Sequence, residues 1–225
     1  MCYLHTVTKT ARSLPVTSEV KHPAATPISL QARKQQFVRD AIWDAAIDLF
    51  AAKGFDETTV DDIAEVAGVS RRSFFRYFSS KSDLMAHGIV SYGAALTEAI
   101  QACPRTWTPS RIFRATVLEV AKRQAAQPRT RKIMEIAGKY PGAREAQLAR
   151  IAEVQDHIAA AFARHSSKKT SDDLTPQIFA ALTLSILGAT FRAWFHSGQD
   201  ISAAVERVFA TLDHFTAEPG LKLPL

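Results

Sequence analysis

The chain has 225 residues, 47% of them hydrophobic, which is enough to bury a core in one domain or two. Its two cysteines, Cys2 and Cys103, lie far apart, which excludes a disulfide framework and a CxxC metal site and favours a reducing cytoplasm. The formal net charge of +6 suits an anionic partner, but total charge is weak support for one.

Residues 1–30 are rich in Thr, Ser, Pro and Ala and lack helical periodicity, so we expect a disordered tail. The tail contains no apolar run of the signal-peptide type, and it resembles a transit peptide only faintly. We expect residues 219–225 to form a second, short tail.

Ordered structure is predicted to begin near Gln31. Apolar residues recur at helical spacing over about 33–53, and Gly54 follows where a glycine commonly ends a helix. This pattern predicts a first long helix with one apolar stripe.

A second, shorter helix is predicted to begin after the hydroxyl-bearing residues Thr58 and Thr59 and to end at Ala67. Gly68 supplies the turn, and Ser70 caps a third helix. Helices this short bury little surface alone, so we expect all three to share a core.

The third helix has two distinct faces. Phe74 and Phe78 are four residues apart and point to the core, whereas Arg72 and Arg76 share the exposed face. In a helix-turn-helix the second helix enters the DNA major groove with its N-terminal residues nearest the bases, which here means Arg71 and Arg72.

Side-chain chemistry suggests roles on that face. An arginine can bind guanine O6 and N7 with two hydrogen bonds, worth ~1–3 kcal/mol of discrimination. Ser73, Tyr77 and Lys81 suit phosphate oxygens, which fix register without reading sequence. No acid occurs over 66–82. A solvated basic face is the alternative interpretation.

Three motifs occur in sequence: AA-x-x-LF-x-x-x-GF, then T-x-x-x-IA-x-x-AGVS, then F-x-x-K. With them, residues 37–86 resemble the DNA-binding domain of the TetR family of one-component bacterial regulators. The resemblance implies a helix-turn-helix domain over 31–80. It implies a DNA interface formed by Thr59, Ser70, Arg71, Arg72, Ser73, Phe75, Arg76, Tyr77 and Lys81.

Three positions depart from the usual family pattern. Phe75 stands where tyrosine is frequent, Tyr77 where histidine is frequent, and Arg72 where a small residue is common. These differences leave the operator sequence open.

After Lys81 the sequence shows only helical patterns, which predicts an all-α fold of about nine helices. The resemblance implies that residues 81–218 bind an effector and dimerise. The predicted later helices run to about 102, then from about 109 to 126, 128 to 138, 143 to 165, 175 to 197 and 201 to 217.

The segment 178–195 is apolar on nearly all sides, although it contains Arg192. A membrane span is the alternative, but helix packing between two subunits explains the pattern at less cost. The resemblance implies a homodimer that meets two DNA half-sites. Expected interface residues are Ala181, Ser185, Gly188, Ala189, Val205, Phe209 and Leu212.

In proteins of this family the middle helices hold a small-molecule effector, whose identity the sequence leaves open. Expected lining residues are Phe113, Val117, Met134, Ile151, Val154, Ile158, Phe162, Phe179 and Leu182, with core packing as the alternative for each. A basic cluster over 122–132 is either a solvated surface or a site for an anionic head group or flanking DNA.

The sequence contains no catalytic or metal-binding motif, and we expect no enzyme activity, no cofactor and no metal site. We therefore expect a bacterial cytoplasmic regulator, with no membrane partner, that binds a palindromic double-stranded DNA operator. Ligand binding is expected to shift the long helix after Lys81 and relieve repression. The alternatives are an activator of the same fold and a helical interaction protein without specific DNA binding.

Overall fold

The computed structural model describes residues 29–165, 173–198 and 200–217. The described residues form ten α-helices and no strand, which confirms the all-α prediction. The predicted tails, 1–30 and 219–225, lie almost wholly outside this part of the chain. The helices are α1 Leu30–Lys53, α2 Val60–Val66, α3 Arg71–Tyr77, α4 Lys81–Ala102, α5 Pro109–Ala125, α6 Pro128–Lys139, α7 Pro141–Leu148, α8 Ile151–Ala163, α9 Thr175–Ser197 and α10 Ile201–Ala217.

One predicted helix is wrong. The expected continuous helix over 143–165 is divided into α7 and α8 by a turn at Ala149 and Arg150. The Arg150 amide donates to the carbonyl of Gln147 at 3.2 Å, so the chain tightens there instead of continuing the α-helical ladder. The break lets both helices pack against α4 in turn. Because neither glycine nor proline marks this turn, the sequence pattern runs across it unchanged.

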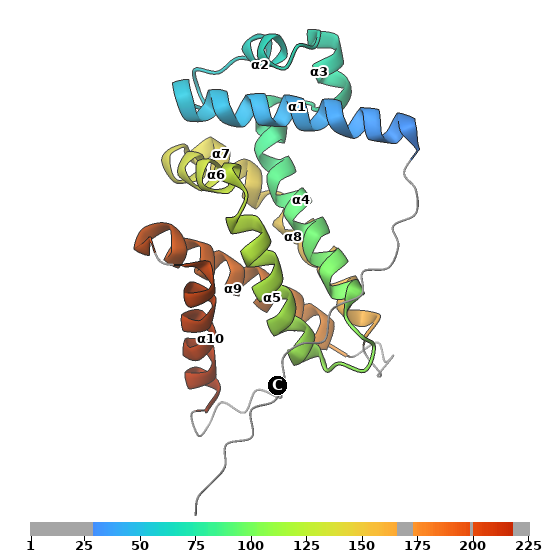
Figure 1. The fold of residues 1–225 in the computed structure, drawn as a ribbon, viewed down its shortest axis with the longest axis vertical. Helices are drawn as coiled ribbons and strands as arrows, with labels where there is room; N and C mark the ends of the chain where they lie inside the picture. The colour runs from blue at the N-terminus through green and yellow to red at the C-terminus, as the bar shows by residue number, and fades with distance from the viewer. Residues whose placement is uncertain (1–28, 166–172, 199, 218–225) are drawn as a thin grey trace, which may run out of the picture.

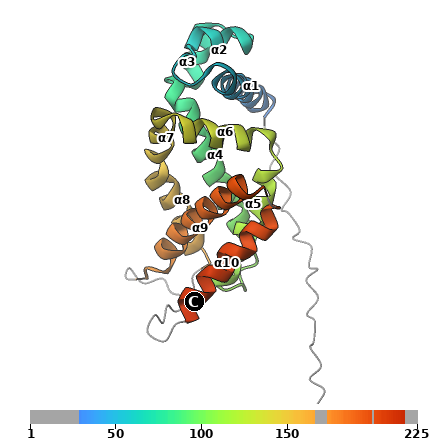
Figure 2. The ribbon, with the colours of Figure 1, turned by 90° about the vertical axis from the view of Figure 1, so that its left-hand side faces the viewer.

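Helices α1 to α3 form one end of the molecule, and α4 runs from them into a larger helical body (Figure 1). The view turned by 90° shows α6 and α7 directly beneath α1, with α9 and α10 at the opposite end (Figure 2). Contacts between α1 and α6 join the two parts in addition to the covalent link through α4. The small unit therefore rests on the body at two places.

Side-chain caps fix the ends of the first helices. The Ser70 hydroxyl accepts from the Ser73 amide at 3.1 Å, and Ser80 caps α4 in the same way. Gly54, which has φ of 100°, ends α1. This backbone conformation requires glycine, and a Cβ at Gly54 would also come within 2.6 Å of the Tyr140 hydroxyl, which would have to shift.

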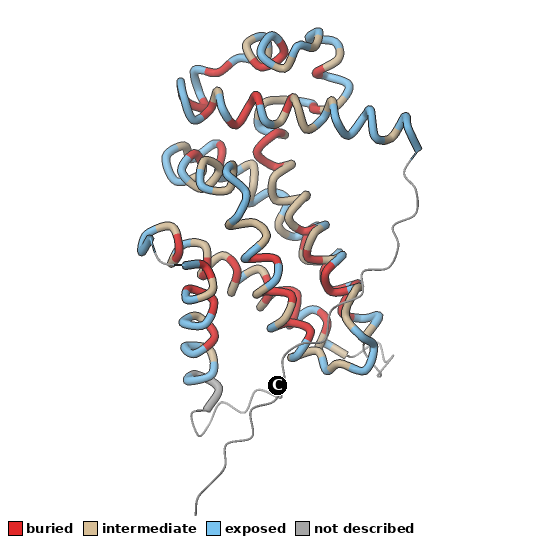
Figure 3. The backbone as a smooth tube through the Cα atoms, in the orientation of Figure 1, coloured by how far each residue is buried: buried red, intermediate tan, exposed pale blue. Residues whose placement is uncertain are grey.

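Burial follows the inner faces of the helices (Figure 3). The first core lies among α1 to α4 and contains Ile42, Phe50 and Phe74. It is completed by Ile136 of α6 and Ala143 of α7. The body has a second core, formed by α4, α5, α8, α9 and α10. The first core therefore depends on residues that belong to the body.

Helix α9 is long and apolar enough to cross a membrane, with a mean hydropathy of 1.6 over its most apolar window. It nevertheless packs against α5, α8 and α10 in the body. Its side chains Phe179, Leu187 and Trp194 are buried in the second core. These contacts account for one face of its apolar surface, because 33% of that window is buried within the chain.

Candidate nucleic-acid interface and ligand cavity

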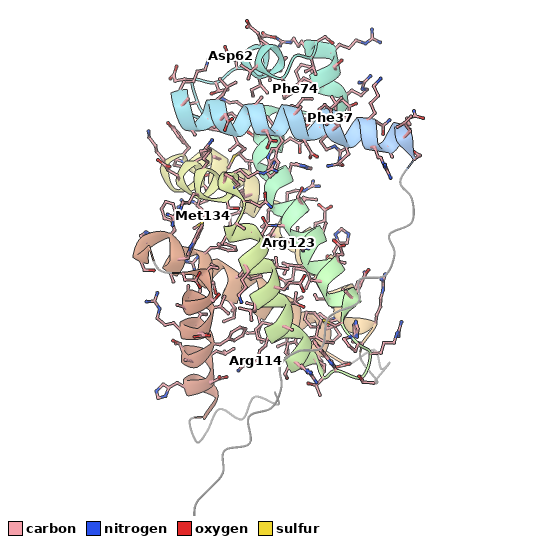
Figure 4. All side chains as sticks on the ribbon, viewed as in Figure 1. Phe37, Asp62, Phe74, Arg114, Arg123 and Met134 are labelled. Atoms are coloured by element: carbon pink, nitrogen blue, oxygen red, sulfur yellow. The ribbon has the colours of Figure 1, made fainter. Side chains whose placement is uncertain are left out.

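Helix α3 is anchored from behind by two phenyl rings. Phe74 is 0% exposed and Phe78 is also buried, with their ring centroids 6.1 Å apart. Figure 4 shows Phe74 between α3 and the neighbouring helices. The opposite face of α3 exposes Arg71, Arg72 and Arg76. The structure thus brings the predicted arginines together on one solvent-facing side.

Arg71 is held by an acid from the preceding helix. Its Nη1 atom lies 2.5 Å from Oδ2 of Asp61, and its guanidinium lies 5.6 Å from the centroid of the exposed Phe75 ring. Arg72 is exposed and forms no ion pair with the described part of the chain. The sequence pattern missed Asp61 as a partner because the two residues are ten positions apart.

Replacing Asp61 with asparagine is expected to strengthen binding to random duplex DNA several-fold. The change frees Arg71 and removes a negative charge beside the arginine face, so one more phosphate contact can form. The slope of log K against log salt should become steeper by about 0.9, measured by fluorescence anisotropy. Glu65→Gln is the matched control, with the same charge change on the same helix. Equal effects of the two changes would contradict this role of Asp61.

Three predicted contact residues are engaged in capping. The Thr59 hydroxyl accepts from the Asp62 amide at 3.2 Å, and Ser70 and Ser73 share the cap of α3. Hydrogen bonds that Lys53 and Thr59 donate to the Asp62 carboxylate hold the pKa of Asp62 far below its ordinary value. Asp62 therefore stays ionised as pH falls to mildly acidic values, and its stabilising effect is lost only as pH falls further.

Tyr77, another predicted contact, lies beside an arginine of the same face. Its hydroxyl accepts from Nη2 of Arg76 at 3.2 Å, and the guanidinium lies 4.9 Å from the ring centroid. Both side chains remain accessible at the end of α3. Arginine and tyrosine side chains can each donate a hydrogen bond to a phosphate oxygen.

Lys81, an expected phosphate contact, has hydrogen-bond partners within the chain. Its Nζ atom donates to the carbonyls of Phe55 and Asp56 at 2.8 Å each and of Thr58 at 3.3 Å. An ammonium group has three donors, so all of them are occupied. Lys81 also lies 4.9 Å from the Phe55 ring centroid. The residue therefore clamps the loop between α1 and α2.

Replacing Lys81 with methionine is expected to destabilise the small helical unit by about 2 kcal/mol, because three carbonyls lose a charged donor. The midpoint of thermal unfolding should fall by about 5 °C, measured by circular dichroism. Lys34→Met, an exposed lysine on α1, is the control and should change little. An unchanged melting midpoint, together with a salt slope reduced by about one unit, would instead place Lys81 on a phosphate.

A cavity of about 530 Å³ lies in the helical body and reaches α1 at Trp43. Its wall is formed by α4 to α9 together with Trp43 of α1. Two predicted effector-site residues, Met134 and Ile151, line it. Figure 4 shows Met134 and Arg123, another lining residue, in the middle of the molecule below α1.

The other seven predicted lining residues do not line this cavity and lie in or against the second core. Phe113 and Phe162 pack their rings against Phe179, at centroid distances of 5.7 and 5.5 Å. These side chains fill the crossing of α5, α8 and α9. The core residues are Phe113, Val117, Val154, Ile158, Phe162 and Phe179, with Leu182 packed against them.

The predicted dimer residues separate into two groups. Val205 and Phe209 are only 2% and 7% exposed within one chain, so little of either side chain is left for a partner. Gly188 lines the cavity, and Leu212 packs on the second core. The remaining residues, Ala181, Ser185 and Ala189, are half-buried or exposed on α9.

Known proteins resemble both parts of the chain. The family described as bacterial regulatory proteins, tetR family, matches residues 42–87, and the MftR C-terminal domain matches residues 107–216. The HTH-type transcriptional regulator TcmR of Streptomyces glaucescens is 27% identical, over 84% of this chain and 87% of its own. The mycofactocin biosynthesis transcriptional regulator MftR of Mycobacterium tuberculosis is 29% identical, over 80% of this chain and 94% of its own.

The fold is also that of solved regulators. NalD of Pseudomonas aeruginosa, a secondary repressor of the MexAB-OprM efflux pump, aligns with a TM-score of 0.58 at 21% identity. The alignment covers 80% of this chain and 96% of NalD. The two family matches and the two relatives together show that this chain belongs to the TetR family of bacterial DNA-binding transcriptional regulators.

Proposed function

We propose that the protein is a ligand-relieved repressor that binds a palindromic operator as a homodimer. The observation that carries this proposal is the arrangement of α3. Its arginines face solvent, while Phe74 on its other side belongs to a core that α6 and α7 complete. The same two helices line the cavity. DNA reading and ligand binding therefore share structural elements.

A second copy of the chain supplies the second recognition helix. A single α3 spans one half-site, and two-fold symmetry places two such helices in successive major grooves about 34–36 Å apart. The outward face of α9 is suited to the partner, because Ile178 is 50% exposed there and Ala181 and Ala189 permit close helix approach.

Ligand relief follows from where the cavity lies. Trp43 of α1 and four residues of α4, Gly88, Ile89, Ser91 and Tyr92, form part of its wall. A ligand that binds better to a widened cavity shifts the equilibrium toward chains in which these helices have moved. That movement changes the spacing of the recognition helices and weakens operator binding.

Repression is the simplest output of such binding, because it requires only that the dimer occupy a promoter. Activation, the second function considered for this fold, needs an added contact with the polymerase. The location of the operator relative to the promoter distinguishes the two. The helical interaction protein without specific DNA binding remains the contrasting hypothesis.

Two measurements on one DNA fragment test this proposal: the sequence that the protein protects and the number of chains that bind. Purified protein is added to the DNA upstream of its own gene, and the protected sequence is mapped by nuclease digestion. We expect an inverted repeat and two chains per fragment in sedimentation. A fragment with one half-site scrambled should bind much more weakly. Protection without symmetry, or one chain per fragment, would contradict the dimeric operator complex.

A further inference from the structure

We propose that the cavity binds an amphipathic anion whose charged group takes Arg129 away from Asp44, and so loosens α1 from α6. This inference rests on the proposed function and adds to it a ligand class and a point of coupling. The charge of the cavity wall, its apolar surface and the contacts at the junction support it separately.

The charged residues of the wall are all of one sign. Four arginines line the cavity, Arg123, Arg129, Arg144 and Arg192, and no Asp or Glu among the described residues does. Arg129 pairs with Asp44, whereas Arg123 donates to the carbonyl of Ala95 at 3.3 Å and forms no ion pair within the described ranges. Arg144 and Arg192 are exposed and form no ion pair with the described part of the chain. Positive charge against low-dielectric walls attracts an anion.

The rest of the wall is largely apolar. Trp43, Met134, Ile151 and Phe191 are among its side chains, so the ligand has an apolar body in addition to its charge. The size of the cavity suits a small molecule of this kind.

The coupling point is the contact between α1 and α6. Arg129 pairs with Asp44, and its guanidinium lies 4.8 Å from the Trp43 ring centroid. The Trp43 indole also donates to the Leu84 carbonyl of α4 at 3.0 Å. Arg129 thus touches the cavity, α1 and a ring fixed to α4 at once.

The ion pair to Asp44 can be exchanged because both side chains are partly exposed, at 34% for Arg129 and 53% for Asp44. Water already reaches both side chains, so an anion within the cavity can replace Asp44 as the partner of the guanidinium. A bound anion leaves Asp44 without its partner and removes one of the two ion pairs between α1 and α6. The other pair, Lys132 with Asp48 at 2.6 Å, provides an internal control.

The probes are four compounds that share a ten-carbon chain and differ in their head groups: decanoate, decyl phosphate, decanol and decyltrimethylammonium. Binding to the full chain is measured by calorimetry below the micelle concentration of each probe. We expect decanoate or decyl phosphate to bind at least about tenfold more tightly than decanol, and the cation to bind most weakly. The tighter of the two anions identifies a carboxylate or a phosphate ligand. Equal binding of decanol and both anions overturns the proposal.

Two variants test the role of Arg129 with operator binding as a second measurement. Arg129→Gln should weaken anion binding about tenfold and abolish the effect of the anion on operator affinity. Lys132→Gln removes the neighbouring ion pair and should leave anion binding unchanged. If both variants reduce anion binding equally, or neither does, the assignment of Arg129 is wrong.

The operator measurement separates this inference from the proposed function. A chain that binds its operator but no anion overturns the inference and leaves the regulator intact. A chain that binds no DNA in the absence of any probe overturns the proposed function, whatever the probes do. Anion binding through Arg129 with unchanged operator affinity overturns the coupling.

Discussion

Replacing Phe74 with alanine should lower the free energy of unfolding of the DNA-binding unit by ~3–5 kcal/mol. The ring is 0% exposed, and it packs between Phe75 and Phe78 at centroid distances of 5.3 and 6.1 Å. Its removal leaves a cavity under the recognition helix. Because a small domain is only marginally stable, we expect most DNA binding to be lost. Denaturant unfolding and anisotropy measure the two effects.

The matched control is Phe75→Ala, the same change one residue along the same helix. Phe75 is 47% exposed, so its removal should cost much less stability. DNA binding by this variant should fall without loss of helical structure, because the ring lies on the expected DNA-facing side. Equal destabilisation by the two changes would mean that Phe74 does not anchor the helix as described.

Replacing Arg71 with alanine should weaken binding to the operator by ~10–100-fold, which corresponds to the loss of ~1–3 kcal/mol of base discrimination. Binding to random DNA should fall much less, because only phosphate attraction is lost there. Competition titrations with operator and random duplexes measure the ratio. We expect Arg71 to read bases because it lies at the start of α3, where side chains approach base edges.

Arg150→Ala is the control for the Arg71 change. Arg150 is also exposed and paired with an acid, Glu153, but it lies in the helical body. Its removal should change neither operator nor random binding appreciably. If Arg71→Ala reduces both kinds of binding by the same factor, Arg71 contacts phosphate and does not read bases.

Sequence patterns predicted the parts of this structure that depend on local spacing. The apolar periodicity of α1, the caps at Thr59 and Ser70, and the division of α3 into a phenylalanine face and an arginine face all follow from residues a few positions apart. The all-α class followed in the same way. These features need no knowledge of which helices meet.

The same reasoning could not predict contacts between residues that are far apart in the sequence. Lys81 was expected on a phosphate, but its partners are carbonyls more than twenty positions earlier. Trp43 of α1 lines the cavity although nothing in its local pattern separates it from other core residues. Seven of the nine body residues expected around a ligand lie in or against a core, because periodicity identifies buried faces without showing which of them enclose a space.

The central claim is that the arginine face of α3 binds a particular duplex. The most direct test is a fluorescence anisotropy titration with DNA from upstream of its own gene and with a scrambled duplex of equal length, from 50 to 200 mM salt. We predict a Kd of ~10⁻⁸–10⁻¹¹ M for the first at physiological salt, at least about 10³-fold tighter than for the second. Equal affinity for both duplexes at every salt concentration would contradict the account.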